Sequence, residues 1–578
     1  MMQTNLLQWC VTVALLLGCA ATSQALQPPT AEQVEQYKKD GTWEERRQAA
    51  LAIGNHKMAP GLAAKTKYKL SRLAYEAAGK TAQEIEQILP APPPAWRNMP
   101  TTGNVKMFVL LIEFNDYLHI STDTQAVVDS RIFGAEDTGS TLYPYESLSA
   151  YYNRSSYGLL NLQGATLGWY KAGNRSSVAQ TYVGREALIK SAINYFEGLG
   201  HDFSQYDNNG DGVIDYFAVI WTGPHGAWAS FWWGYQTEFS DSSYTVDGKK
   251  LGGYSWQWEA DYYPNGSFEP LTLIHETGHG LGLPDYYDYD DSVGPKGGVG
   301  GLDMMDATWG DHNAFSKFVL DWLTPTVIKA GAYPGQVLAP SSDATAPQTL
   351  LVMPNAASTP FQEFFMVQHR KPERNDVQIP TDGLLIWHVD ARLDGGGNDY
   401  LYDNSYTAHK LLRLMEADGL EEIEQNKEAD AGDFYVPGST FTDSTSPNSK
   451  AYNGLATGIE VTNIAAAGND ITCDVTLPFP LLQVFKGGTG SGTVTSSPAG
   501  IDCGGTCSAS FDSGASVTLT AAADSGSLFT GWSGACSGAS DTCVVTMDAV
   551  KKSAQANFWL ENTPPVPWLP AVKMLLKK

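Results

Sequence analysis

The spacing of hydrophobic residues changes along the chain and predicts regions with different secondary structure. Before residue 100, apolar residues recur at helical spacing in AEQVEQYKKDGTWEERRQAALAIG and KTAQEIEQILPAPPPAWRNMP, and a proline-rich stretch ends the region. Between 101 and 325, continuous apolar runs typical of buried strands, VKMFVLLIEF and DYFAVIWTG, alternate with helical patterns such as REALIKSAINYFEGL. This mixture predicts an α+β domain in which helices pack on a central sheet.

The rest of the chain has the pattern of β structure. Short apolar strands such as QTLLVMP, EFFMVQHR and GLLIWHV follow one another between 326 and 480 and predict an all-β sandwich or jelly roll. A shorter stretch rich in glycine, serine and threonine, 481–560, predicts a small β module, and a tail of 561–578 follows it. The predicted fold class is therefore multidomain, with an α+β domain followed by two all-β domains.

Residues 1–25 have the layout of an export signal. An apolar run, Val11–Leu17, precedes small residues and a Ser-Gln-Ala cleavage site that ends at residue 25. The run lacks preceding basic residues, and LLGC, ending at Cys19, resembles a lipobox, so a lipid anchor is the alternative to secretion. No other stretch reaches the roughly 18 to 20 apolar residues that span a bilayer. We therefore predict a secreted protein with a helical propeptide at 26–100; a permanent helical subdomain is the alternative.

Charge restricts the class of partner. The 578 residues include 37 lysines and arginines against 63 aspartates and glutamates, a net charge of −26. A chain this acidic should repel nucleic acid and anionic lipid, so neither is expected as a partner. The same composition suits an exported protein that binds calcium.

Cysteines cluster near the C-terminal end. Cys503, Cys507, Cys536 and Cys543 lie in the predicted small module, whereas Cys473 is isolated. Four cysteines in a small domain of this composition indicate disulfides formed in an oxidising compartment. A structural zinc site is the rival, but the spacings C-x3-C and C-x6-C fit it poorly and no histidine lies nearby.

The stretch HETGHGLGLPD carries a candidate metal site. His275 and His279 are four residues apart, so on a helix both imidazoles reach one zinc ion. Glu276 would lie beside the open coordination position as general base for a water. Gly282 can take a positive φ and end the helix, which brings Asp285 back as third ligand. The alternative is a solvated helix end followed by an acidic turn.

A second oxygen-rich segment, DNNGDGVID, has the spacing of a calcium loop. Its candidate ligands are Asp207, Asn209, Asp211, Val213 (through its carbonyl) and Asp215. Gly212 stands at the sharp turn, but Ala218 occupies the position where an EF-hand has a bidentate glutamate. The chain also continues into a predicted strand there. The segment is therefore no EF-hand, and a turn rich in aspartate and asparagine is the alternative to a calcium site.

Residues 275–288 closely resemble the signature of the immune inhibitor A-type metallopeptidases, H-E-x-G-H-x-L-G-L-P-D-x-Y-D. Other segments resemble further parts of that family: VLLIEFND, LSAYYNRSSYGLLNL, HDFSQYDNNGDGVIDYFAVIWTG and GGLDMMDATWGDHNAFSKFVLDWL. The resemblance covers about 105–475. It implies a secreted zinc endopeptidase whose 101–325 region has a metzincin-like catalytic domain.

The resemblance also implies roles for particular residues. His275, His279 and Asp285 would be the zinc ligands and Glu276 the general base. Met305 matches the methionine turn beneath the metal, with Met304 as the alternative by one position. Asp288 and Asp306 are alternative third ligands. Tyr286, Tyr287 and Tyr289 are near enough in sequence to stabilise an oxyanion, although such tyrosines more often pack.

The segment 484–558 resembles the small β repeat modules found on many bacterial surface and secreted proteins. The resemblance favours the pairs Cys503–Cys507 and Cys536–Cys543, each closing a short loop, although other pairings stay open. Trp532 is expected in the core of the module, with a ligand-binding platform as the alternative.

These observations predict a secreted, zinc-dependent endopeptidase that acts on proteins or peptides, with calcium as a structural ion. One alternative is an adhesion protein with a vestigial zinc site. Another is a zinc amidohydrolase that acts on a non-peptide amide.

Overall fold

The structure is a computed structural model, and it describes residues 29–77, 80–89, 99–290, 298–343, 348–354, 363–395, 399–405, 409–425, 427–512, 514–547 and 551–561. The predicted export signal, including Cys19, lies outside the described residues, as do the proline-rich stretch 90–98 and the tail beyond residue 561. Within the described ranges, no helix is both long and apolar enough to cross a membrane.

The region before residue 90 is helical, as predicted. Its helices are α1 (Ala31–Asp40), α2 (Trp43–Ile53), α3 (Pro60–Ala77) and α4 (Ala82–Ile88). Thr30 and Thr81 form capping boxes that start α1 and α4, and Gly41 and Gly54 end α1 and α2 in the left-handed conformation. Sequence signals at the helix ends therefore account for these boundaries.

A five-stranded sheet organises the 101–325 region, in the order β2-β1-β3-β5-β4. Its strands are β1 (Gly103–Glu113), β2 (Leu160–Lys171), β3 (Val213–Trp221), β4 (Tyr235–Glu238) and β5 (Lys250–Trp258). All pairs are parallel except β4 with β5, so β4 is an antiparallel edge strand. Both faces are covered, which explains the continuous apolar runs in the sequence.

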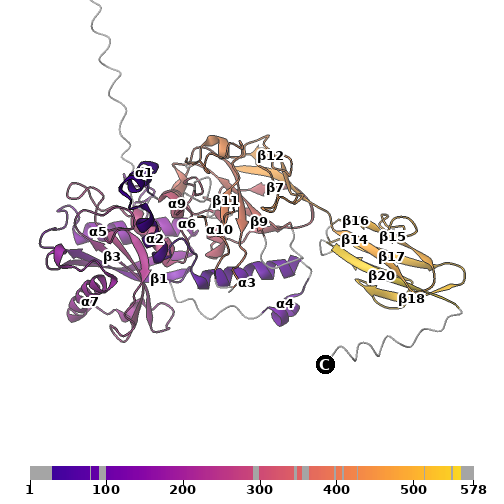
Figure 1. The fold of residues 1–578 in the computed structure, drawn as a ribbon, viewed down its shortest axis with the longest axis horizontal. Coiled ribbons are helices and arrows are strands. Elements are labelled where there is room, and N and C mark those ends of the chain that lie inside the picture. Colours follow the sequence, from indigo (N-terminus) through magenta and orange to yellow (C-terminus); the bar gives the residue numbers. More distant parts are fainter. Residues whose placement is uncertain are drawn as a thin grey trace, which may run out of the picture.

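Alternate residues of β1 belong to two different cores. Met107, Val109 and Leu111 lie in the core that also contains α6 and α8 residues, whereas Phe108 and Leu110 lie in the core beneath α7. The helices of this region are α5 (Gln125–Phe133), α6 (Leu148–Ser155), α7 (Tyr182–Gly198), α8 (Leu271–Gly280), α9 (Met304–Ala307) and α10 (Ala314–Val319), with short 3-10 turns η1 (Arg175–Ser177) and η2 (Ser204–Tyr206). The predicted mixture of helix and strand is confirmed (Figure 1).

The 326–480 region consists of two sheets, with orders β11-β10-β9-β8-β6 and β12-β13-β7. Its elements are β6 (Thr326–Ile328), β7 (Gly331–Leu338), β8 (Thr349–Val352), β9 (Glu363–Arg370), β10 (Gly383–Asp390), β11 (Leu412–Leu414), β12 (Glu460–Ala467) and β13 (Asp470–Leu477), with turns η3 (Arg374–Asp376) and η4 (Ala431–Asp433). Leu384 and Ile386 of β10 face the core between these sheets, and Leu385 and Trp387 face the α8 core. A continuous core therefore crosses the predicted boundary at residue 325, and the domain limits stay predictions.

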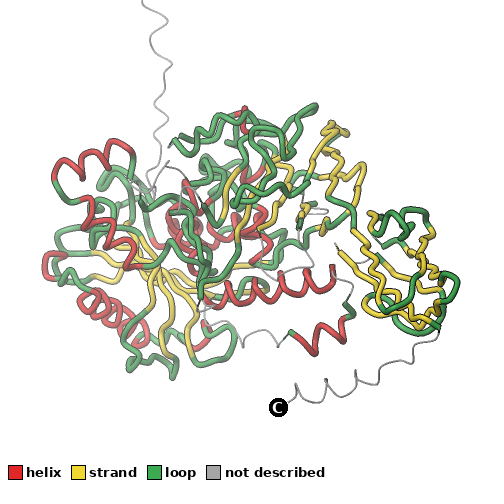
Figure 2. The backbone as a smooth tube through the Cα atoms, turned by 45° about the vertical axis from the view of Figure 1, so that its right-hand side comes forward, coloured by secondary structure: helices red, strands yellow, loops and turns green. Residues whose placement is uncertain are grey.

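The C-terminal module has sheets of order β16-β14-β20-β18 and β15-β17-β19 and lies at one end of the molecule (Figures 1 and 2). Its strands are β14 (Leu481–Gly487), β15 (Gly492–Ser497), β16 (Ser508–Ser510), β17 (Ser516–Ala523), β18 (Ser527–Gly534), β19 (Thr542–Thr546) and β20 (Lys551–Leu560). Disulfides join Cys503 to Cys507 and Cys536 to Cys543. Trp532 is buried in the module core, as expected.

Candidate metal centre

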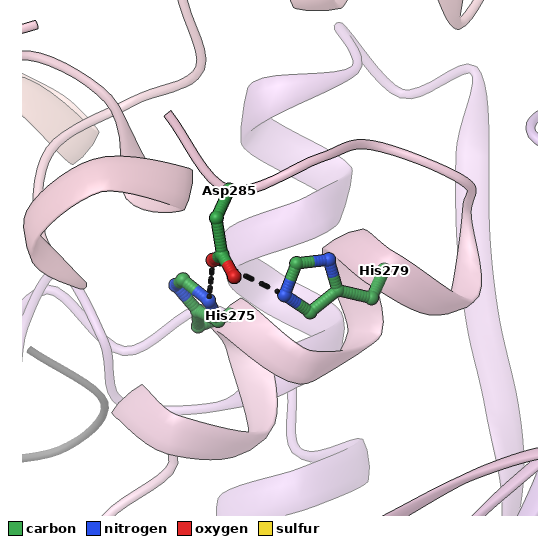
Figure 3. A group of neighbouring side chains, drawn as sticks. All are labelled: His275, His279 and Asp285. Atoms are coloured by element: carbon green, nitrogen blue, oxygen red, sulfur yellow. Dashed lines mark hydrogen bonds and ion pairs between the residues drawn. The ribbon is translucent and has the colours of Figure 1, made fainter. Parts of the chain in front are cut away.

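The helix α8 carries both histidines of the candidate site. It begins directly after Pro270, and Gly282 has a φ of 98°, which turns the chain back toward the helix. Asp285 then reaches both imidazoles: its Oδ1 lies 2.9 Å from Nε2 of His275 and 3.3 Å from Nε2 of His279 (Figure 3). One ligand atom from each of these three side chains lies within 4.8 Å of the other two, close enough for all three to bind one metal ion.

Backbone carbonyl groups fix the orientation of both imidazoles. Nδ1 of His275 lies 2.8 Å from the carbonyl oxygen of Met304, and Nδ1 of His279 lies 2.8 Å from that of Leu283. A carbonyl oxygen only accepts, so each Nδ1 carries the proton. The lone pair of the neutral ring is then on Nε2, the atom that faces Asp285, as a metal ligand requires.

Buried atoms without partners test whether this site fits a metal. Both carboxylate oxygens of Glu276 are buried without a hydrogen-bond partner. Nε2 of His279 is also buried without one, because its contact with Asp285 is too poorly aligned to be a hydrogen bond. Buried polar atoms normally have partners. A cation and its bound water would supply them, and two imidazoles with one carboxylate are a donor set that zinc accepts.

Burial and close charges shift the pKa values of the site. Burial raises the pKa of Glu276 to about 8. Burial disfavours a charged His279, but Asp285 overcomes it and raises the imidazole pKa to about 9. The two histidines likewise overcome burial and hold the pKa of Asp285 well below its usual range. Burial and the interactions among Glu276, His279 and Asp285 therefore set these three pKa values together.

Tyrosines that follow Asp285 support the site or pack elsewhere. Tyr289 donates to Oδ2 of Asp285 at 2.5 Å, and Tyr287 stacks on Tyr289 with ring centroids 5.0 Å apart. The hydroxyl of Tyr286 contacts Oγ of Ser316 at 2.9 Å. Tyr289 therefore orients Asp285, a role that the sequence pattern did not indicate.

Both candidate methionines of the turn lie at the site, in different roles. Met304 supplies the carbonyl oxygen that accepts from His275. The sulfur of Met305 packs against α8 so closely that a Cβ on Gly278 would lie 2.3 Å from it. Met305 therefore forms an apolar support beneath the helix segment between the two histidines.

The alternative third ligands have other contacts. A carboxylate oxygen of Asp306 accepts from the backbone N–H groups of Val299 and Gly301, at 3.0 and 2.7 Å. Oδ1 of Asp288 accepts from the backbone N–H of Asp290 at 2.7 Å. Within the described residues, neither joins both histidines in a metal-binding group.

The helical N-terminal region contacts the loop of the candidate site. The carbonyl oxygen of Asn55 accepts from the N–H of Asp285 at 2.7 Å, and the N–H of Ala59 donates to the carbonyl oxygen of Gly282 at 2.9 Å. Trp43 stacks on Trp228, and Tyr37 and Ala50 pack in one cluster with Trp228, Tyr287 and Tyr289. His275 and Glu276 are 0% exposed. The N-terminal helices thus help to bury the site.

The predicted calcium loop is closed by its own backbone. Asp207 accepts from the N–H groups of Gly210, Asp211 and Gly212 at 2.8 to 3.0 Å, and Nζ of Lys249 lies 2.7 Å from its Oδ2. Oδ1 of Asp215 is buried without a hydrogen-bond partner, and burial raises the pKa of Asp215 to about 6. Lys249 therefore already supplies a positive charge beside Asp207. Calcium binding here stays a prediction.

Comparisons with known proteins find two similarities. Residues 483–562 match the family described as divergent InlB B-repeat domain, in agreement with the small β module. Immune inhibitor A of Bacillus thuringiensis subsp. alesti is 26% identical, over a stretch that covers 32% of this chain and 34% of that protein. The chain thus matches about a third of its relative's length. The two matches support a distant relation to immune inhibitor A and a repeat module at the C-terminal end.

Proposed function

We propose that the protein is a secreted, zinc-dependent endopeptidase with a metzincin-like catalytic region. The convergence of His275, His279 and Asp285 beside a buried, unpartnered Glu276 carries this proposal. The distant relation to immune inhibitor A supports it. Zinc held by the three side chains would polarise a scissile carbonyl and acidify a water molecule.

Glu276 would act as the proton carrier of the reaction. Its carboxylate accepts the proton of the attacking water and then delivers it to the nitrogen of the leaving amine. Met304 and Leu283 keep the two imidazoles in the ligand tautomer, and Tyr289 keeps Asp285 oriented. No nucleophilic serine or cysteine is required.

The edge strand β4 favours an extended peptide as substrate. It lies beside α8, at the end of the sheet, and pairs with β5. An extended peptide that adds to the outer edge of β4 would run past α8 and bring a backbone carbonyl toward Glu276. A small non-peptide amide could not add to that edge as an extended strand.

Removal of zinc is expected to abolish this activity. Purified protein should degrade casein, a zinc chelator should stop the reaction, and added zinc should restore it, because the ligands stay in place. If zinc-loaded protein leaves casein intact, the proposal is contradicted. Hydrolysis of small model amides would then indicate a non-peptide amidohydrolase. No hydrolysis of either substrate would indicate an adhesion protein.

We further propose that residues 26–100 are a propeptide. α2 lies beside β4, and the contacts of Asn55 and Ala59 hold the loop of the third ligand. The active secreted form is therefore expected to begin near residues 95–105, which N-terminal sequencing of enzyme from culture medium measures. Full activity in a form that begins at Leu26 would show that the helices are a permanent subdomain.

A further inference from the structure

Carboxylates gather in an acidic loop, residues 416–433, between β11 and the end of η4. Donor oxygens of Glu416, Asp418 and Asp433 lie within 4.8 Å of one another, and those of Asp418, Glu422 and Asp430 form a second such group. Asp418 belongs to both groups. This loop is remote in sequence from the candidate zinc site and from the 207–215 segment.

Two buried carboxylate oxygens among the described residues of this loop have no hydrogen-bond partner, Oε2 of Glu424 and Oδ1 of Asp433, but Glu424 is already paired with Lys410. Asp433 is 1% exposed, and its Oδ2 accepts from the N–H of Asp430 at 2.7 Å. Its Oδ1 is buried without any hydrogen-bond partner among the described residues. Burial raises the pKa of Asp433 to about 6 and that of Glu416 to about 7, and neighbouring carboxylates add to both shifts. A buried carboxylate without a counter-charge is costly, so a bound cation would stabilise this group.

The nearby basic side chains are paired with other acids. Lys427 contacts Glu422, Arg413 contacts Glu421, and Lys410 lies 2.6 Å from Glu424. Among the described residues, no lysine, arginine or histidine forms an ion pair with Glu416, Asp418 or Asp433. The inner group therefore has no cationic side chain that a bound cation would have to displace.

The backbone holds the inner group in place without an ion. Glu416 accepts from the N–H of Glu422 at 2.5 Å, and the N–H of Ala417 donates to the carbonyl oxygen of Asp433 at 3.2 Å. Gly432 permits close approach, because a Cβ there would lie 2.6 Å from Oδ2 of Asp418. A side chain at this position would fill the space between the carboxylates.

The acidic loop also contacts the segment that leads to the methionine turn. The N–H of Ala429 donates to the carbonyl oxygen of Gly300 at 2.9 Å. Gly300 has a φ of 69°, and a Cβ on it would lie 2.6 Å from Cδ1 of Ile423. The N–H of Ile423 in turn donates to Oε1 of Glu416 at 3.3 Å. Glu416 is thus connected through Ile423 to the chain just before Met304.

We propose that the acidic loop binds one calcium ion through Glu416, Asp418 and Asp433, and that this ion fixes Ile423 and Ala429 against Gly300. Calcium suits the site because all the donors are oxygens held by the protein at irregular spacing. Magnesium retains several waters in near-octahedral geometry, and zinc prefers nitrogen and sulfur ligands. Asp430, an exposed member of the second group, adds negative charge that attracts the ion.

Equilibrium dialysis with radioactive calcium tests the site on the full chain after calcium removal. Asp433→Asn and Asp418→Asn should each lose one bound calcium per chain or bind it about tenfold more weakly, because a charged ligand is lost. Glu428→Gln, an exposed carboxylate of the same loop outside both groups, should bind as the wild type does. Unchanged binding in both aspartate variants would overturn the proposal, and loss only in Asp211→Asn would assign the calcium to the 207–215 segment instead.

Two further measurements separate loss of the site from misfolding. Without calcium, Asp433→Asn should melt no lower than the wild type, since it removes an unpaired buried charge. With calcium, the melting temperature of the wild type and of Glu428→Gln should rise, and that of Asp433→Asn should not. Calcium should also slow hydrogen exchange of the Ala429 amide in the wild type and in Glu428→Gln, but not in Asp433→Asn. Equal calcium effects on the wild type and Asp433→Asn would refute the site.

Discussion

Replacing Glu276 with glutamine is expected to reduce casein hydrolysis by about 10²- to 10⁴-fold while zinc stays bound. The side chain lies on α8 next to His275 but outside the group formed with His279 and Asp285. Glutamine keeps nearly the same shape, so the ligands should stay in place, but its amide cannot accept the proton of the attacking water. Turnover on casein and zinc content per chain are the two measurements.

A matched control separates this role from general damage to the helix. Glu269 is an exposed carboxylate directly before Pro270, at the start of the same helix. Glu269→Gln should hydrolyse casein at the wild-type rate. Wild-type turnover in Glu276→Gln would remove the proposed mechanism, and loss of zinc from that variant would make Glu276 a ligand rather than a base.

Asp285→Ala is expected to weaken zinc binding by about tenfold or more, because even a residue that only orients a ligand contributes that much. Its Oδ1 faces both imidazoles, and its Oδ2 accepts from Tyr289. Asp288→Ala should have a milder effect, since its Oδ1 accepts from the backbone of Asp290. Competition with a chromogenic zinc chelator measures both affinities.

The comparison of the two aspartate variants decides the third ligand. Equal zinc affinities, or a greater loss in Asp288→Ala, would show that Asp285 is misassigned. His275 and His279 would keep their roles in that case. Asp285→Asn refines the test, because it retains an oxygen for Tyr289 but loses the charge that balances the metal.

Local sequence signals predicted the parts of the site that local geometry determines. The four-residue spacing of His275 and His279 needs only a helix, and Gly282 needs only its own positive φ to return the chain to Asp285. The alternating faces of β1 likewise follow from a period of two residues. These features depend on neighbours within a few positions.

Contacts between distant segments could not be predicted in this way. The hydrogen bond from Asp285 to Asn55 joins residues that are far apart in sequence, and no periodicity indicates it. The oxygen spacing of the 207–215 segment gave no sign that Lys249 pairs with Asp207. The carboxylates of the acidic loop have no regular spacing, and only folding brings Glu416 to Asp433.

The position of α3 has a consequence for processing of the chain. Leu62, Leu70 and Ala74 lie in the same core as residues of β1 and β10. A cut between α4 and β1 removes the covalent connection but leaves these contacts in place. The N-terminal fragment then becomes a separate ligand whose release follows mass action. If residues 26–100 are a propeptide that inhibits the proposed peptidase, dilution of the nicked protein should therefore restore activity, and added fragment should inhibit it again.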